Sequence, residues 1–311
     1  MKILVTGASG FLGRFLCKKL CERGDDVTEV STKNCDLTKS ASLCQFTEHF
    51  DEIYHLASWT QAGDFCLYHP GEQWIINQQI NTNVLQWWQQ EHPLAKLIAI
   101  GTSCSYAPDF PCKEENYLQG EPIDSLFTYG MTKRMLLVGL RALQKQYGMR
   151  YLYLIPSTLY GPGYHTDGRQ LHFIFDLIRK IMRGKFENEP VILWGDGHQR
   201  RELVHVFDFV NVMINTSAEN EIFNVGAGAD YSIRGFAQII CDSLDYPFKK
   251  IQFDTSKYVG ALSKVLHTEK LGPFKQIPLQ EGLEQTIEWF LQNRQMLEPR
   301  EPKHRFAKAL G

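Results

Sequence analysis

The sequence lacks a long apolar run, an excess of either charge, and any regular spacing of cysteines. Its 311 residues include 33 basic and 35 acidic side chains, a formal net charge of −2, and this balance argues against a nucleic-acid-binding or membrane-surface protein. Nothing approaches the roughly 18 uninterrupted apolar residues that span a bilayer. The segment from Met1 to Gly10 has no signal-peptide pattern. We therefore expect a cytoplasmic protein with no nucleic-acid or membrane partner.

The eight cysteines are scattered along the chain, and no C-x-x-C pair occurs among them. In a chain of this length, such scatter indicates reduced thiols rather than a disulfide framework or a zinc site. No metal is therefore expected. Internal repeats and low-complexity tracts are also absent from the sequence.

The composition provides enough apolar material for a large core, with 43% hydrophobic and 12% aromatic residues. The length suits two domains of roughly 150 residues or one large α/β unit with an appendage. Through the first half, short apolar runs alternate with amphipathic stretches, which is typical of a β-α-β series. The expected strands are 2–6, 26–31, 52–57, 96–101 and 151–155, and the expected helices are 11–23, 40–49, 72–90 and 128–147. Several of these strands are apolar without alternation, so we predict an α/β fold with a doubly wound parallel sheet covered on both faces.

After Pro156 the alternation becomes less regular. The expected elements there are helices at 171–184 and 280–293 and short strands at 191–194, 202–206 and 224–227. We predict a first domain of residues 1–156, to whose sheet part of 202–225 returns. Residues 157–296 would form a smaller, interleaved α/β domain against the carboxyl ends of the strands, and residues 297–311 a loosely held tail.

A glycine-rich turn joins the first strand to the first helix. Gly7 allows a sharp turn, Gly10 allows close approach of a pyrophosphate, and Gly13 allows the helix to pack near the strand. This position makes a dinucleotide site a stronger interpretation than a ligand-free turn. The expected cofactor contacts on this turn are Gly7, Ser9, Gly10, Phe11, Leu12 and Gly13.

The second strand ends without the carboxylate that would bind the ribose hydroxyls of NAD. It runs instead from Val30 through Ser31 and Thr32 to Lys33, and a cation there would favour the 2′-phosphate of NADP. We therefore predict NADP as the cofactor and NAD as the alternative. Asp36 and Leu37 are placed to lie beside the adenine, although Asp36 could equally be an ordinary turn aspartate.

Tyr129 and Lys133 lie at i and i+4 on one helix face. An ammonium beside a phenol stabilises the phenolate and lowers its pKa, so the tyrosine could exchange a proton with a carbonyl oxygen during hydride transfer. A surface pair is the plain alternative. Upstream, the segment from Gly101 to Tyr106 places hydroxyl groups at the end of an apolar strand, where one of them could bind the same oxygen.

Together these segments resemble the extended short-chain dehydrogenase/reductase (NAD-dependent epimerase/dehydratase) family over about residues 1–296. The resemblance extends to His55-Leu56-Ala57-Ser58, Asn77, Asn81-Thr82-Asn83 and Leu159-Tyr160-Gly161-Pro162. It implies a Rossmann domain with a nucleotide-sugar domain, further cofactor contacts at Leu56, Ala57 and Pro156, and a homodimer built on helices 72–90 and 128–147.

Within this family the chain is most similar to the GDP-L-fucose synthase branch, the epimerase/reductases of GDP-4-keto-6-deoxymannose. The similar runs are Thr102–Tyr106, Gln146-Tyr147-Gly148, Pro156–Pro162, Trp194–Gly197, Arg200–Val206 and Asn224–Gly228, followed by Ser232-Ile233-Arg234. By position, the resemblance assigns the catalytic hydroxyl to Thr102, the Tyr/Lys pair to Tyr129 and Lys133, and the proton-exchanging pair to Cys104 and His172.

That last pair makes chemical sense, because inverting a carbon beside a ketone requires removal of a proton from one face and its return to the other. A thiolate near cations can act as the base and an imidazole as the acid. The alternatives are a packing thiol for Cys104 and a surface histidine for His172. The Asp-Glu pair of the family's dehydratases is replaced by Ser103 and Cys104, which disfavours dehydration.

The resemblance also implies a set of substrate contacts. Arg179, Arg201 and Lys264 would hold the diphosphate or would otherwise be solvated surface cations, and Trp194 would contact the substrate or be a half-buried strand residue. The remaining expected contacts, which should face the sugar, are Ser103, Thr158 and Phe173.

The chain departs from the branch's pattern at several of these positions. Thr102 replaces a serine, Leu126 and Thr158 replace asparagines, Phe173 replaces a smaller aliphatic residue, and residues 59–69 lack a V-G-G run. A colitose or heptose intermediate, or a dTDP-linked sugar, therefore stays open as the substrate.

The sequence thus predicts an NADP-dependent epimerase/reductase of a nucleotide-linked 4-keto-6-deoxy sugar, with a GDP sugar favoured. It would exchange protons at C3 and C5 and then transfer hydride to C4. A C4 reductase without epimerisation is the first alternative, and a catalytically silent NADP-binding protein is the second.

Overall fold

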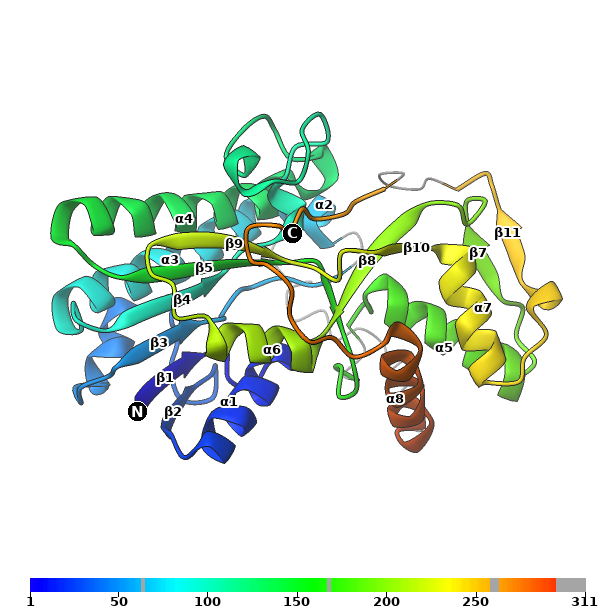
Figure 1. Cartoon of the computed structure of the whole chain (residues 1–311), viewed down its shortest axis with the longest axis horizontal. Helices are drawn as coiled ribbons and strands as arrows, with labels where there is room; N and C mark the ends of the chain where they lie inside the picture. Colours follow the sequence, from blue (N-terminus) through cyan, green and yellow to red (C-terminus); the bar gives the residue numbers. More distant parts are fainter. Residues whose placement is uncertain (63–64, 167–168, 258–262, 295–311) are drawn as a thin grey trace, which may run out of the picture.

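The computed structural model describes residues 1–62, 65–166, 169–257 and 263–294, and these form a larger and a smaller lobe (Figure 1). The larger lobe contains a six-stranded sheet in the order β2-β1-β3-β4-β5-β9, and every neighbouring pair is parallel. Its strands are β1 (Lys2–Thr6), β2 (Asp26–Val30), β3 (Glu52–His55), β4 (Lys96–Ile100), β5 (Tyr151–Pro156) and β9 (Glu221–Val225). The predicted doubly wound parallel fold is confirmed.

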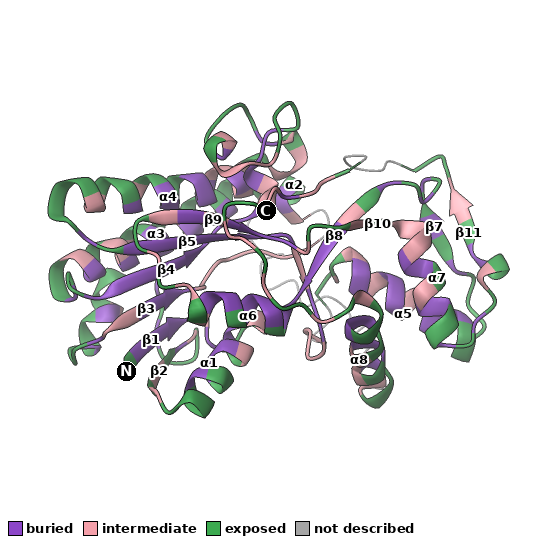
Figure 2. Cartoon of the chain, viewed as in Figure 1, coloured by how far each residue is buried: buried purple, intermediate pink, exposed green. Residues whose placement is uncertain are grey.

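Helices cover both faces of this sheet, as Figures 1 and 2 show. Ile3 and Val5 of β1 belong to a core shared with α1 (Phe11–Arg23) and α6 (Val206–Asn215). The intervening Leu4 belongs to the core on the opposite face, under α3 (Pro70–Glu91) and α4 (Phe127–Tyr147). Both faces of the strand are therefore apolar, which explains why the sequence shows no alternation there.

The smaller lobe has its own core and two short sheets. In one, β8 (Arg200–His205) pairs with β6 (Thr158–Tyr160) and β10 (Asp230–Ser232), and in the other β7 (Ile192–Trp194) pairs with β11 (Gln252–Asp254). The helices around this core are α5 (Phe173–Phe186), α7 (Ile233–Ser243) and α8 (Leu279–Gln292). Between these elements the chain returns to the larger lobe, where α6 packs on α1 and β9 extends the sheet. The domain limits at 156 and 296 stay a prediction, and residues 297–311 lie outside the described part of the chain.

The structure corrects one expected helix and adds elements that the sequence did not predict. Residues 40–49 form only a 3-10 helix, η1 (Ser40–Gln45), because no side chain caps the segment and Phe46 and Phe50 turn into the core instead. The additions are α2 (Phe65–Tyr68), α6, α7, β6, β10, β11 and the 3-10 turns η2 (Ser103–Ser105), η3 (Glu114–Asn116), η4 (Asp124–Leu126) and η5 (Phe248–Lys250).

The described residues contain neither a helix that could cross a membrane nor a candidate metal site. None of their helices has the length and hydropathy needed to cross a membrane. Nor does any group of three or more His, Cys, Asp or Glu side chains among them form a candidate metal site.

Candidate active site

The glycine turn lies where the order of the sheet strands reverses, between the carboxyl ends of β1 and β3. Gly7 has a φ of +70°, and a Cβ there would lie 2.9 Å from the backbone nitrogen of Ala57. A Cβ on Gly13 would lie 2.2 Å from the carbonyl oxygen of Gly7. No side chain caps the N-terminus of α1 at Gly10, so its first N–H groups are left to bind an anion. The turn therefore fits the pyrophosphate of a dinucleotide, and Ser9, Phe11 and Leu12 lie along it.

The other expected cofactor residues take up defined positions around this turn. The backbone N–H groups of Leu56 and Ala57 donate to the Thr6 hydroxyl at 3.1 and 3.2 Å, and Pro156 ends β5. Asp36 accepts hydrogen bonds from Thr38, which hold the pKa of its carboxyl below the usual range. Leu37 is buried, and its carbonyl accepts a hydrogen bond from Asn83. Contact of these residues with a cofactor stays a prediction.

A buried histidine that the sequence analysis gave no role, His55, lies near enough to Lys133 to be influenced by its charge. The Thr6 hydroxyl and His55 Nδ1 are 2.9 Å apart, and His55 Nε2 and Asn81 Oδ1 are 3.1 Å apart. Because the Thr6 oxygen already accepts two N–H groups, it donates to Nδ1, and Nε2 donates to Asn81. Burial, assisted by the charge of Lys133, lowers the pKa of His55 to about 4. His55 is therefore a neutral, fixed ring.

Three buried amides on α3, at i, i+4 and i+8, hold the segment that follows β3. Asn81 binds His55, Asn77 binds both the N–H and the carbonyl of Trp59, and Gln73 donates to the Cys66 thiol at 3.4 Å. The helical spacing of Gln, Asn and Asn is the sequence signal that could have predicted this buried polar face.

The expected catalytic hydroxyl and phenol lie near each other. Thr102 follows β4, and its side chain acts to lower the pKa of Tyr129, near the start of α4, against the larger effect of burial. The Thr102 hydroxyl also accepts the backbone N–H of Cys104 at 3.2 Å, and Ser103 lies between them in η2. This turn holds Cys104 near the phenol, where its charge contributes to raising the pKa of Tyr129.

The expected effect of Lys133 on Tyr129 is not seen in the protein alone. Burial raises the pKa of Tyr129, and Lys133 is not among the main groups that shift it. Burial also lowers the pKa of Lys133 to about 8. Desolvation thus outweighs the attraction predicted from the i, i+4 spacing, and the charge of Lys133 acts on His55 instead.

The remaining cluster comes from the smaller lobe and faces Cys104. Arg201 of β8 and Cys104 interact electrostatically, and Arg201 and Lys264 both act on His172. His172 caps α5, where its Nδ1 accepts the N–H of Phe173 at 3.2 Å, so Nε2 carries the proton. Although His172 is exposed, the surrounding protein and the two cations lower its pKa to about 4. The structure thus assembles four residues that are far apart in sequence around the Thr102–Tyr129 pair.

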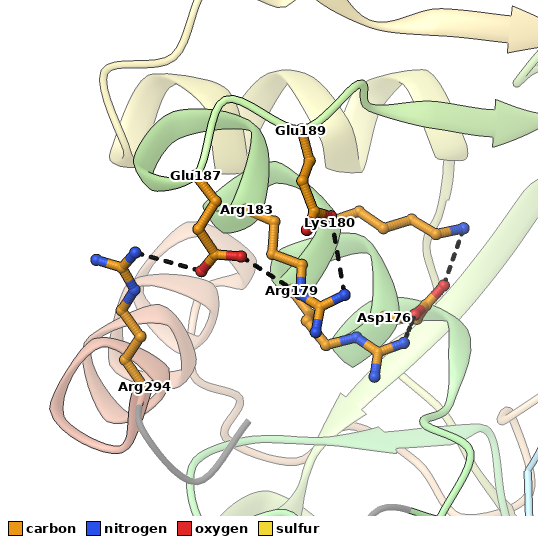
Figure 3. Close-up of polar contacts among 7 residues, drawn as sticks. All are labelled: Asp176, Arg179, Lys180, Arg183, Glu187, Glu189 and Arg294. Carbon is orange, nitrogen blue, oxygen red and sulfur yellow. Dashed lines mark hydrogen bonds and ion pairs between the residues drawn. The ribbon is translucent and has the colours of Figure 1, made fainter. Parts of the chain in front are cut away.

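Two expected substrate residues lie in a separate pocket. Arg179 donates to Asp176 at 2.5 Å, and Lys180 pairs with the same carboxylate at 3.1 Å (Figure 3). Arg179 and Trp194 line a pocket of about 400 Å³ whose lining does not include Arg201. The substrate contacts implied by the resemblance therefore fall into two groups. Arg179 and Trp194 line this pocket, whereas Arg201 and Lys264 lie near His172.

Most of the chain matches the model of a known protein family. The model of the NAD dependent epimerase/dehydratase family matches residues 3–226. The chain belongs to this family. It is an enzyme of the dinucleotide-dependent class that the family name describes.

Among its relatives in the NAD dependent epimerase/dehydratase family, the GDP-L-fucose synthase of Escherichia coli K12 is 28% identical, covering 94% of this chain and 97% of its own. The structure of a Naegleria fowleri GDP-L-fucose synthetase bound to NADP has a TM-score of 0.82 at 22% identity, covering 94% and 95% of the two chains. A GDP-mannoheptose C4 reductase of Campylobacter jejuni with NADP bound has a TM-score of 0.81 at 22% identity, covering 93% and 98%. At this identity the two structures show the shared fold.

The departures from the branch's pattern have identifiable positions in this member of the family. Thr158 begins β6, Phe173 begins α5 and packs toward Phe236, and Leu126 directly precedes α4. Whether they face a sugar stays a prediction.

Proposed function

We propose that the protein is an NADP-dependent epimerase/reductase of a GDP-linked 4-keto-6-deoxy sugar. The observation that carries the proposal is the meeting of Tyr129, Thr102 and Cys104 from one lobe with His172 and Arg201 from the other. The curated relative named GDP-L-fucose synthase and the NADP-bound structures of similar fold support the choice of substrate class and cofactor.

NADPH bound along the glycine turn would supply the hydride. The exposed Lys33 after β2 would hold its 2′-phosphate in place of the carboxylate that favours NAD. Tyr129 gives its phenolic proton to the C4 ketone oxygen as that oxygen becomes an alkoxide, and the Thr102 hydroxyl holds the same oxygen. We assign buried Lys133 the role of supplying positive charge near the phenol as its proton leaves, an effect that is not seen in the protein alone.

Proton exchange at C3 and C5 is assigned to Cys104 and His172. The ketone makes the neighbouring C–H groups acidic, because Tyr129 and Thr102 stabilise the enolate oxygen. Cys104 would act as the base in its thiolate form, and Arg201, which interacts with it electrostatically, supplies positive charge nearby. His172, whose Nδ1 accepts the Phe173 N–H, carries its proton on Nε2 and would act as the acid. A diphosphate bound by Arg201 and Lys264 would cancel the two charges that disfavour the imidazolium.

We also propose a homodimer that pairs α3 and α4. The two helices pack on each other and expose large apolar side chains, including Ile75 on α3 and Met135 and Val138 on α4. An exposed apolar face on adjacent long helices suits a helix-bundle interface. Light scattering behind size exclusion tests it: a monomer mass at micromolar concentration would refute the dimer.

A C4 reductase without epimerisation is the second candidate, because His172 is neutral and its Nδ1 is engaged as the cap of α5. The C4 reductase with the shared fold supports this alternative. In this case Cys104 and His172 would contribute only to packing and helix capping.

One incubation separates the two. The protein is mixed with NADPH and GDP-4-keto-6-deoxymannose in D2O. Cofactor oxidation is followed at 340 nm, and the deuterium content of the product is measured by mass spectrometry. NADPH oxidation with deuterium on the ring carbons is the expected result. Oxidation without deuterium would leave the C4 reductase. No oxidation with this substrate or with its heptose- and dTDP-linked counterparts would refute the proposed reaction.

A further inference from the structure

The β7–β11 pair presents an aromatic ring and a carboxylate side by side on its outer face. The two strands are parallel, with Leu193 opposite Phe253 and Trp194 opposite Asp254. Leu193 is 5% exposed and belongs to the core, and Phe253 packs against that core. Because side chains alternate between the faces of a sheet, Trp194 and Asp254 share the opposite face. Trp194 is 58% exposed.

This face forms one wall of the pocket of about 400 Å³, and α5 contributes cations to it. Figure 3 shows these basic side chains on α5, with Arg183 directed toward Glu189. The pocket contains two carboxylates, Glu189 and Asp254. Glu189 forms an ion pair with Arg183 at 3.8 Å. Asp254 lies across the pocket beside Trp194.

The carboxylate of Asp254 is fixed in position and ionised. Its Oδ1 accepts the backbone N–H of Ser256 at 3.0 Å and the Ser256 hydroxyl at 2.6 Å. These bonds, with the nearby charge of Lys257, hold the pKa of the Asp254 carboxyl below its usual range. No hydrogen bond from the described residues reaches Oδ2. The Asp254 carboxylate can therefore accept hydrogen bonds from a ligand, and it is already held in place beside the exposed indole of Trp194.

We propose, on the basis of the proposed function, that Asp254 selects guanine as the base of the nucleotide sugar. The base would stack on Trp194. Guanine carries two adjacent donors, N1–H and the 2-amino group, and a carboxylate accepts both through charge-assisted bonds. Uracil and thymine present a single N–H flanked by two carbonyl oxygens, which the carboxylate repels, and adenine presents an acceptor at N1. Asp254 is thus a specificity-determining residue with no role in the chemical steps.

Titration calorimetry of the full chain with nucleoside diphosphates tests this directly. Inosine diphosphate lacks only the 2-amino group, so wild type should bind GDP about tenfold or more tightly than IDP, since the Asp254 carboxylate then loses one charge-assisted donor. UDP and dTDP should bind still more weakly. Equal binding of GDP and IDP would overturn the proposal.

Asp254→Asn gives a gain-of-function readout. The amide oxygen still accepts from Ser256, so the turn is preserved, while the NH2 group now faces the base. Xanthine has a carbonyl where guanine has the 2-amino group, so the variant should prefer xanthosine diphosphate over GDP by about tenfold. Glu189→Gln, the other carboxylate of the pocket, should keep the wild-type preference for GDP. A D254N variant that folds by circular dichroism yet still prefers GDP would overturn the assignment, and if it does not fold, the IDP comparison on wild type decides.

These measurements use neither NADPH nor a sugar, so their failure is distinct from failure of the proposed reaction. Selective GDP binding without reduction of any keto sugar would refute the reaction and leave Asp254 as the guanine contact. Reduction of a GDP sugar by a protein that binds GDP and IDP equally would support the proposed reaction and refute Asp254 as the guanine contact.

Discussion

Lowering the pH from 7 to 5 should destabilise the protein through His55. In the folded state the pKa of this ring is about 4, whereas a histidine in the unfolded chain has a pKa of about 6.5. As the pH falls through 6.5, the unfolded chain gains a proton that the folded protein does not accept. Stability contributed by the neutral ring is therefore complete above pH 6.5, is lost as the pH falls, and stops changing below about pH 4.

The magnitude follows from these two pKa values. Linkage gives a loss of about 2 kcal/mol between pH 7 and pH 5 from this single group. The hydrogen bonds agree with the direction, because a proton on Nδ1 would face the Thr6 hydroxyl, which already accepts from Leu56 and Ala57. The proton would also add a charge beside Lys133.

Urea unfolding of wild type and His55→Gln at pH 7 and pH 5 measures the effect. Glutamine can occupy a similar polar space but does not titrate, so the variant should lose about 2 kcal/mol less than wild type over this interval. Other histidines contribute equally to both proteins and cancel in the difference. Equal losses in the two proteins would refute the assignment of a neutral, buried His55.

Three further predictions concern the cofactor turn and the catalytic cluster. Gly13→Ala places a Cβ against backbone atoms of the turn, so it should cost about 1–3 kcal/mol in urea unfolding and weaken NADPH binding measured by fluorescence. In contrast, Gly71→Ala, where a Cβ meets nothing within 4 Å, should be neutral or slightly stabilising, and equal effects of the two would contradict the predicted close packing. Tyr129→Phe should slow NADPH oxidation by about 100-fold or more without changing the circular dichroism, and near-normal turnover would exclude Tyr129 as the proton donor. Cys104→Ser and His172→Asn should each reduce deuterium incorporation more than NADPH oxidation, and full incorporation in either variant would remove that residue from proton exchange.

Most of the larger lobe was predictable because its signals are local, although α6 was missed and residues 40–49 were wrongly expected to form an α-helix. Strands with continuous apolar residues indicate burial on both faces of the sheet, and the glycines at 7 and 13 indicate a turn that has no room for a side chain. The five predicted strands lie within two residues of those found. The smaller lobe was predicted less completely, since β6, β10 and β11 have three residues each, too few for a periodic pattern to emerge.

The residues of the candidate site also fall into two groups: those that local sequence patterns predict and those that only contacts between distant segments bring together. The sequence alone was enough to predict the glycine turn, the Tyr129–Lys133 spacing and the hydroxyl that follows β4, because each depends on neighbours within one turn or one strand end. Contacts between distant segments were needed to bring His172, Arg201 and Cys104 into one cluster and to place Asp254 beside Trp194. The same contacts make burial, rather than the i, i+4 ammonium, the main influence on the pKa of Tyr129. Desolvation and long-range charge depend on every chain segment that surrounds a group, and no local pattern in the sequence encodes that surrounding.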